Sequence, residues 1–236
     1  MNSTMNKDDI NNAIAKTCIE IVKEPLLYFS EADIQQSLAE ELRKIKAIKK
    51  TYQTLINKGK VSKSLYETPL LHREYGGGAR TRIDIVIFSE DDVKKINDPN
   101  LTISKKYLEP DFAFELGTEK TTNIGKHLVN DIIKLNNVKS AGYIIHIYTD
   151  RTKSVTGTKL RKNTKDKIIR NFKSVFEKNK CTNGNIKKLA ILLSPFKDQE
   201  LTKGKCEIFN RTNRKWEKVN VAYVNDLREK IIDQLN

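Results

Sequence analysis

Two acidic residues interrupt stretches of the chain that otherwise have the composition of β-strands. Asp84 lies in the segment 81–88, which is rich in β-branched residues, and Glu115 lies in the apolar segment 111–117. A carboxylate in such a strand is costly to bury unless it is paired or binds a cation. Two carboxylates on neighbouring strands repel each other, and a divalent cation with a preference for oxygen ligands, such as Mg²⁺, removes that penalty. Either acid alone would more often pair with a surface Lys or Arg, but together they predict a metal site.

A second acid precedes Glu115 in the same segment, because Pro110 is followed by Asp111. Asp111 and Glu115 are four residues apart in one extended strand and therefore roughly 13 Å apart. One metal ion cannot bridge that distance. Asp84 is the better first ligand, because it comes from a neighbouring strand.

The elements that must position these acids follow from hydrophobic periodicity and turn signals. We expect helices over residues 9–22, 31–57, 121–138 and 226–235, and another helix that follows a basic segment from residue 151 and ends near residue 178. We expect strands over residues 69–75, 81–88, 111–117, 141–148, 189–193, 206–209 and 219–224. This order predicts an α/β fold with a central mixed β-sheet flanked by helices. We expect one domain over residues 1–200, with residues 201–236 as a C-terminal extension packed on it.

The second expected helix has a clear start and carries acids on its buried face. Ser30 is a good N-cap, and Asp33 lies three residues on, as in a capping box. At about 100° per residue, Glu31 and Glu41 both fall within about 60° of Ile34 on the apolar stripe. An acid in the first turn is also favoured by the helix dipole, so Glu31 has a structural explanation as well as a functional one.

The order of these elements resembles the core of the PD-(D/E)xK, or restriction-endonuclease-like, nucleases (αβββαβ). The segments that carry the resemblance are 30–35, 72–75, 82–87, 114–117 and 130–135, within a region that runs from about residue 26 to 150. The resemblance implies that Asp84 and Glu115 hold Mg²⁺, or alternatively Mn²⁺. It also implies that a helix acid supports the metal. Glu31 matches that position better than Glu41, because it lies nearer the helix start.

The sequence departs from the family pattern at the lysine that follows the glutamate by two residues. That position is Gly117. Lys120 is the preferred substitute, because Gly117 and Thr118 allow a turn that brings it back. Lys134 on the next helix is a second candidate, and a third reading has no lysine in this role and weak or absent activity.

The charge of the chain favours a polyanionic partner. The formal net charge is +14, from 44 Lys and Arg against 30 Asp and Glu, and bound phosphates would release counterions. We expect DNA contacts from two groups of basic residues. One group lies beside the Gly-rich turn at residues 76–78, and the other lies in the basic segment after residue 150: Arg80, Arg82, Lys153, Lys159, Arg161, Lys162 and Lys165. The alternative for the basic segment is a solvated helix face, and an AT-rich genome would also enrich lysine.

The remaining features indicate a cytoplasmic protein. Its three cysteines form no CxxC pair, which indicates free thiols rather than a disulfide or structural zinc. The N-terminus lacks a signal-peptide apolar region, and no apolar run approaches the roughly 20 residues of a membrane span.

From these features and the resemblance we expect a Mg²⁺-dependent endonuclease that hydrolyses phosphodiester bonds in DNA, of the type II restriction kind. The resemblance also implies a homodimer, because two active sites are needed to cut both strands. One alternative is a non-catalytic DNA-binding module on a degenerate nuclease fold. Another is a nuclease that acts on RNA or on structured DNA.

Overall fold

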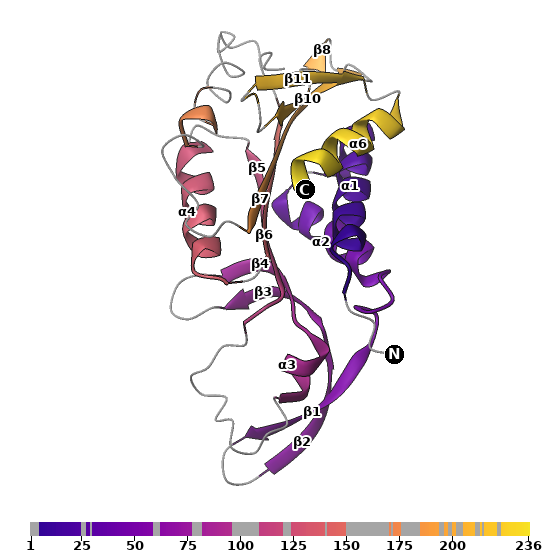
Figure 1. The fold of residues 1–236 in the computed structure, drawn as a ribbon, viewed down its shortest axis with the longest axis vertical. Helices are drawn as coiled ribbons and strands as arrows, with labels where there is room; N and C mark the ends of the chain where they lie inside the picture. Colours follow the sequence, from indigo (N-terminus) through magenta and orange to yellow (C-terminus); the bar gives the residue numbers. More distant parts are fainter. Residues whose placement is uncertain are drawn as a thin grey trace.

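The structure, a computed structural model, describes residues 5–24, 27–28, 30–58, 62–76, 82–95, 109–119, 124–139, 141–149, 170, 172–175, 185–193, 196–197, 200–201, 205–210, 213, 215–220 and 223–236. Within these ranges the chain folds around a seven-stranded mixed sheet with helices on both faces (Figure 1). The expected α/β class is confirmed.

The order of strands in the sheet is β11-β10-β7-β6-β5-β4-β3. In chain order the strands span Leu71–Gly76 (β3), Arg82–Ile87 (β4), Phe112–Glu119 (β5), Ala141–Thr149 (β6), Ile186–Leu193 (β7), Lys205–Asn210 (β10) and Lys215–Asn220 (β11). The three central strands β5, β6 and β7 are parallel, and every other pairing is antiparallel. Parallel strands require a crossover, which helix α4 (Ile124–Asn136) provides between β5 and β6.

The helices cover the two faces unequally. Helices α1 (Lys7–Lys23), α2 (Glu31–Arg43) and α6 (Val224–Leu235) lie on one face of the sheet, and α4 lies on the other (Figure 1). Strands buried on both sides are almost continuously apolar, as β6 and β7 are here. His146 on β6 is a polar side chain that is fully buried in this layer.

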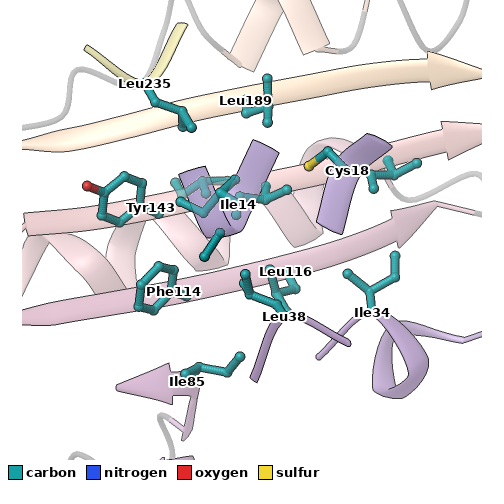
Figure 2. Packing of buried hydrophobic residues seen from close by; sticks show 14 of the residues in the cluster. Ile14, Cys18, Ile34, Leu38, Ile85, Phe114, Leu116, Tyr143, Leu189 and Leu235 are labelled. Atoms are coloured by element: carbon teal, nitrogen blue, oxygen red, sulfur yellow. The ribbon is translucent and has the colours of Figure 1, made fainter. Parts of the chain in front are cut away.

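The larger core lies between the sheet and the three helices. Figure 2 shows Ile14, Cys18, Ile34, Leu38 and Leu235 of these helices beside Ile85, Phe114, Leu116, Tyr143 and Leu189 of the sheet. Because successive strand residues face opposite sides, Phe114 and Leu116 on this face place Glu115 on the other face, toward α4.

The expected helix over residues 31–57 is wrong in its second half. Helix α2 ends at Arg43, and after a turn the chain forms β1 (Thr51–Lys58), which pairs with β2 (Ser62–Pro69) in a separate antiparallel ribbon. Tyr52, whose spacing extends the apolar stripe of the expected helix, therefore lies in a strand. This ribbon and helix α3 (Glu90–Lys95) lie at the end of the molecule away from β10 and β11 (Figure 1).

The other helices and strands expected in the described ranges agree with the structure to within a few residues, except in the tail. Most of the segment from residue 151 to 178 lies outside the described residues. The last expected strand, residues 219–224, is misplaced, because β11 covers 215–220 and α6 begins at Val224. Short strands β8 (Phe196–Lys197) and β9 (Glu200–Leu201) pair with each other. Residues 172–175 are helical, within the helix expected up to residue 178. No helix of the described ranges is long and apolar enough to cross a membrane.

Candidate active site

Asp84 lies where strands β4 and β5 cease to pair. Their ladder runs from Ile87↔Phe112 to Ile85↔Phe114, and its continuation would set Asp84 opposite Glu115. In place of a backbone bond, the Leu116 amide donates to Asp84 Oδ2 over 2.7 Å. Residues directly opposite in an antiparallel pair share a face, so both carboxylates point to the α4 side of the sheet.

The environment of Asp84 disfavours its charge. The residue is only 7% exposed, and burial raises the pKa of its carboxyl to about 7. The nearby Glu31 and Asp131 add to this effect, whereas the Leu116 amide and Lys134 oppose it. A carboxylate in this position gains from any additional cation.

Glu115 is more deeply buried than Asp84. Its residue exposure is 0%, and Oε2 accepts a 2.7 Å hydrogen bond from Lys134 Nζ. Oε1 is buried and has no hydrogen-bond partner within the described part of the chain. Burial, followed by the charges of Asp84 and Asp131, raises the pKa of Glu115 despite Lys134. A buried carboxylate oxygen without a partner, beside a second carboxylate, is costly, and a bound cation would offset that cost.

Lys134 is the lysine that the structure brings to Glu115. It lies on α4, with Nζ also 3.5 Å from Asp131 Oδ1 and with 21% of its side chain exposed. Burial alone would lower the pKa of Lys134, but the charges of Glu115 and Asp131 outweigh burial and leave the pKa raised. The preferred substitute, Lys120, lies outside the described residues.

His146 fills the space beside Gly117. The two residues are partners in the parallel β5–β6 register, and a Cβ added at Gly117 would lie 2.7 Å from His146 Cε1. The imidazole is fully buried, with Nε2 2.8 Å from Asp131 Oδ2. Burial works to raise the pKa of Asp131, but the hydrogen bond and charge of His146 outweigh it, and the pKa is lowered.

Glu31 and His127 lie at the edge of this cluster. His127 Nε2 is 3.8 Å from Glu31 Oε2 and 3.6 Å from Asp131 Oδ2, so the first turn of α2 meets α4 here. Burial raises the pKa of Glu31, and Asp131 adds to this effect while His127 opposes it. Glu41, the other candidate helix acid, instead pairs with Lys16 at 2.8 Å and with Lys44.

Gln35 supports Asp84 from the second turn of α2. Its Nε2 donates to the Asp84 carbonyl oxygen and to Glu74 Oε1, each over 3.0 Å, and Arg73 donates to its Oε1 over 2.7 Å. Glu74, which the β3–β4 register would place opposite Asp84, has a positive φ of 52° and is absent from that ladder. The Gln35 amide therefore takes the Asp84 carbonyl that the ladder leaves unpaired.

Among the described residues, Arg82 and Asp111 are not brought to this cluster. Arg82 is exposed, with a guanidinium nitrogen 4.0 Å from Glu74. The expected DNA-binding residues Arg80, Lys153, Lys159, Arg161, Lys162 and Lys165 lie outside the described residues. Asp111 precedes β5 at its opposite end, and its amide donates to the Ile87 carbonyl oxygen.

Sequence reasoning gave His146 no site role, gave His127 little weight and did not single out Gln35. The available signals were a histidine inside the apolar strand 141–148 and the spacing of His127, Asp131 and Lys134, which places all three on one face of α4.

The two strand carboxylates fit a hard divalent cation. Within the described ranges, no three His, Cys, Asp or Glu side chains are grouped so as to hold a metal ion. Two carboxylates alone do not suit structural zinc, which takes four protein ligands. Mg²⁺ is commonly bound by one or two carboxylates, with waters and substrate phosphate oxygens as the remaining ligands. Asp84 and Glu115 would be those carboxylates.

Comparisons with family models, with curated proteins and with solved structures found no match to this chain.

Proposed function

We propose that the protein is a metal-dependent nuclease of the PD-(D/E)xK superfamily that hydrolyses phosphodiester bonds in DNA. The single observation that supports this most strongly is the buried pair Asp84 and Glu115, with Lys134 at Glu115 Oε2 and with Glu115 Oε1 lacking a partner among the described residues. Burial of two neighbouring carboxylates is expensive unless a cation compensates their charge.

Each side chain has a defined task in this proposal. Asp84 and Glu115 would hold Mg²⁺, and the chemistry that this ion would supply is charge stabilisation at the scissile phosphate and activation of the attacking water. Lys134 offsets the negative charge of the phosphate and orients the water from the α4 side. The Gln35 side-chain amide donates to the backbone carbonyl oxygen of Asp84 and so fixes the backbone there. The Asp84 carboxylate then stays directed into the cluster.

A polyanionic substrate is supported by charge near the β1–β2 ribbon. Residues 42–66 contain eight basic residues and no acid: Arg43, Lys44, Lys46, Lys49, Lys50, Lys58, Lys60 and Lys63. Of these, Lys46, Lys49 and Lys50 are exposed in the turn before β1. Such residues contribute sequence-independent affinity for a phosphate backbone.

The test is cleavage of plasmid DNA with Mg²⁺ or Mn²⁺, beside the same reaction in a chelator. Asp84→Asn and Glu115→Gln should each reduce cleavage by at least about a hundredfold, the scale expected when a metal ligand is lost. Glu41→Gln is the matched control, since Glu41 is also a buried acid but pairs with Lys16 and Lys44 away from the cluster.

The outcomes separate the candidate functions. Cleavage by wild type and Glu41→Gln alone supports the proposal, with discrete bands indicating site-specific cutting and a smear indicating non-specific cutting. Binding of DNA by all variants with cleavage by none would identify a non-catalytic DNA-binding module. Cleavage of RNA or branched DNA in place of duplex would identify the other alternative.

A further inference from the structure

Three residues close to Lys134 and Glu115, namely Gly117, Asp131 and His146, have no task in the proposed reaction. We propose that Asp131 and His146 are positioning residues that hold the Lys134 ammonium group against Glu115, and that Gly117 is small because His146 occupies its space. This inference rests on the proposed function, because it concerns the lysine of that same site.

A side chain at residue 117 would compete with the His146 imidazole for the same space. Gly117 and His146 are adjacent on parallel strands, and both face α4. An added Cβ at residue 117 would meet three imidazole atoms at 2.7–2.8 Å, which is closer than non-bonded carbon atoms approach. The imidazole is fully buried and cannot swing away into solvent. A lysine at residue 117 and a histidine at residue 146 therefore exclude each other.

The second step is the orientation of His146. Its two ring nitrogens have partners on opposite sides: Nε2 is 2.8 Å from Asp131 Oδ2, and Nδ1 is 3.2 Å from the Tyr148 hydroxyl. An ionised carboxylate only accepts hydrogen bonds, so Nε2 donates to Asp131, while Nδ1 and the Tyr148 hydroxyl share a hydrogen bond whose direction follows the protonation of the ring. Both contacts fix the ring plane, and the ring in turn fixes one oxygen of Asp131.

The third step leads from Asp131 to Lys134. Asp131 Oδ2 is held by His146, and Oδ1 lies 3.5 Å from Lys134 Nζ, one turn further along α4, as an ion pair without a hydrogen bond. The ammonium group therefore lies between Asp131 Oδ1 and Glu115 Oε2, which is 2.7 Å away. A lysine side chain loses up to about 2 kcal/mol of rotamer entropy when fixed, and a second carboxylate offsets that cost. Without Asp131, we expect the Lys134 side chain to extend toward water.

A buried His–Asp pair can also serve only to attach α4 to the sheet, and the variants must separate that role from positioning. His146→Leu removes the donor to Asp131 but preserves apolar volume, whereas His146→Gln preserves a donor nitrogen near the Nε2 position. Asp131→Asn keeps the shape of the side chain and removes its charge. Circular dichroism and thermal melting establish that each variant is folded before any other measurement.

The first readout does not depend on activity. Amine acylation followed by mass spectrometry reports how accessible Lys134 is, with the exposed Lys49 as an internal standard. Labelling of Lys134 should rise several-fold in Asp131→Asn and His146→Leu, and should stay near the wild-type level in His146→Gln. Equal Lys134 labelling in all folded variants would overturn the inference, whether or not the protein is a nuclease.

The second readout is kinetic. In Asp131→Asn and His146→Leu, kcat for DNA cleavage should fall by about 10–100-fold, the usual effect of removing a residue that orients an active group, with KM within about twofold. His146→Gln should recover most of the activity. Wild-type-like kcat in the first two variants, beside an inactive Lys134→Met, would refute positioning and leave the nuclease intact. Absence of cleavage by the wild type would instead refute the nuclease.

The third readout exchanges the two lysine positions. Lys134→Met with His146→Ala should be inactive, and adding Gly117→Lys to this pair should raise cleavage at least tenfold. The added lysine would share a strand face with Glu115, two residues away, in the space that the imidazole vacates. Gly117→Lys in the presence of His146 should give no such gain, because the space is filled. A gain of the same size in both backgrounds would contradict the steric step.

Discussion

The buried charge of Asp84 makes a quantitative prediction for the metal-free protein. The carboxyl is 7% exposed, and burial raises its pKa from 3.8 to about 7. A raised pKa means that the folded state holds the proton more tightly than the unfolded state does. The associated stability is therefore fully present below about pH 4 and is lost as the pH rises through about 7.

The size of this effect follows from the pKa difference. About three pKa units at 1.36 kcal/mol each give about 4 kcal/mol, and this already includes the favourable hydrogen bond from the Leu116 amide. Asp84→Asn removes the charge and keeps an oxygen that accepts this bond. In the presence of a chelator, the variant should be more stable than the wild type by up to about 4 kcal/mol near pH 8 and nearly equal to it near pH 4.

The assay is urea unfolding in a chelator at both pH values, with the slope against denaturant compared between the two proteins. Adding Mg²⁺ should then stabilise the wild type alone, by about 1.4 kcal/mol when the cation is at about ten times its Kd. A metal-free Asp84→Asn variant that is less stable than the wild type near pH 8 would show that the carboxylate is a structural group. The electrostatic reasoning for a cation site would then fail.

Three further predictions concern the support of the site, the core and the substrate. Gln35→Ala should lower the free energy of unfolding by about 1–3 kcal/mol in denaturant titration, because the buried Asp84 carbonyl loses its donor; no loss would mean that the β3–β4 ladder closes instead. Leu38→Ala should cost about 2–5 kcal/mol by the same measurement, and a smaller loss would show that the core around α2 collapses to fill the space. Replacing Lys49 and Lys50 together by glutamine should reduce the salt dependence of DNA binding, measured by fluorescence anisotropy, by about two in log–log slope, and an unchanged slope would exclude them as phosphate contacts.

The strands that carry the carboxylates were predictable because their patterns are dense and local. Segment 81–88 is nearly all apolar or β-branched, and β4 spans Arg82–Ile87. The capping box that starts α2 was equally readable, since Ser30 and Asp33 bond each other's backbone amides as the spacing indicates. In these cases, neighbouring residues in the sequence supply the whole signal.

The helix expected over residues 31–57 failed where two local signals conflict. Apolar spacing continues past Arg43, but Thr51, Tyr52 and Thr54 are β-branched or aromatic residues that favour a strand. Pairing with Ser62–Pro69 supplies the backbone partners that make the ribbon stable, and that pairing is not visible in either segment alone. The apolar spacing of α2 therefore continues into residues 51–58, but pairing with Ser62–Pro69 makes that segment a strand.

The position of the lysine could not be predicted from the strand sequence, because it depends on contacts between three elements. Gly117 departs from the family pattern, and the strand alone suggests that a charge has been lost. His146 on β6 excludes a side chain at that point, and the same imidazole fixes Asp131, which lies one turn of α4 from Lys134. The histidine that prevents a lysine on the strand thus helps to hold a lysine on the helix, at 2.7 Å from Glu115. On this argument, the side chains at residues 117, 134 and 146 depend on one another, and Gly117→Lys should be more harmful alone than combined with His146→Ala and Lys134→Met.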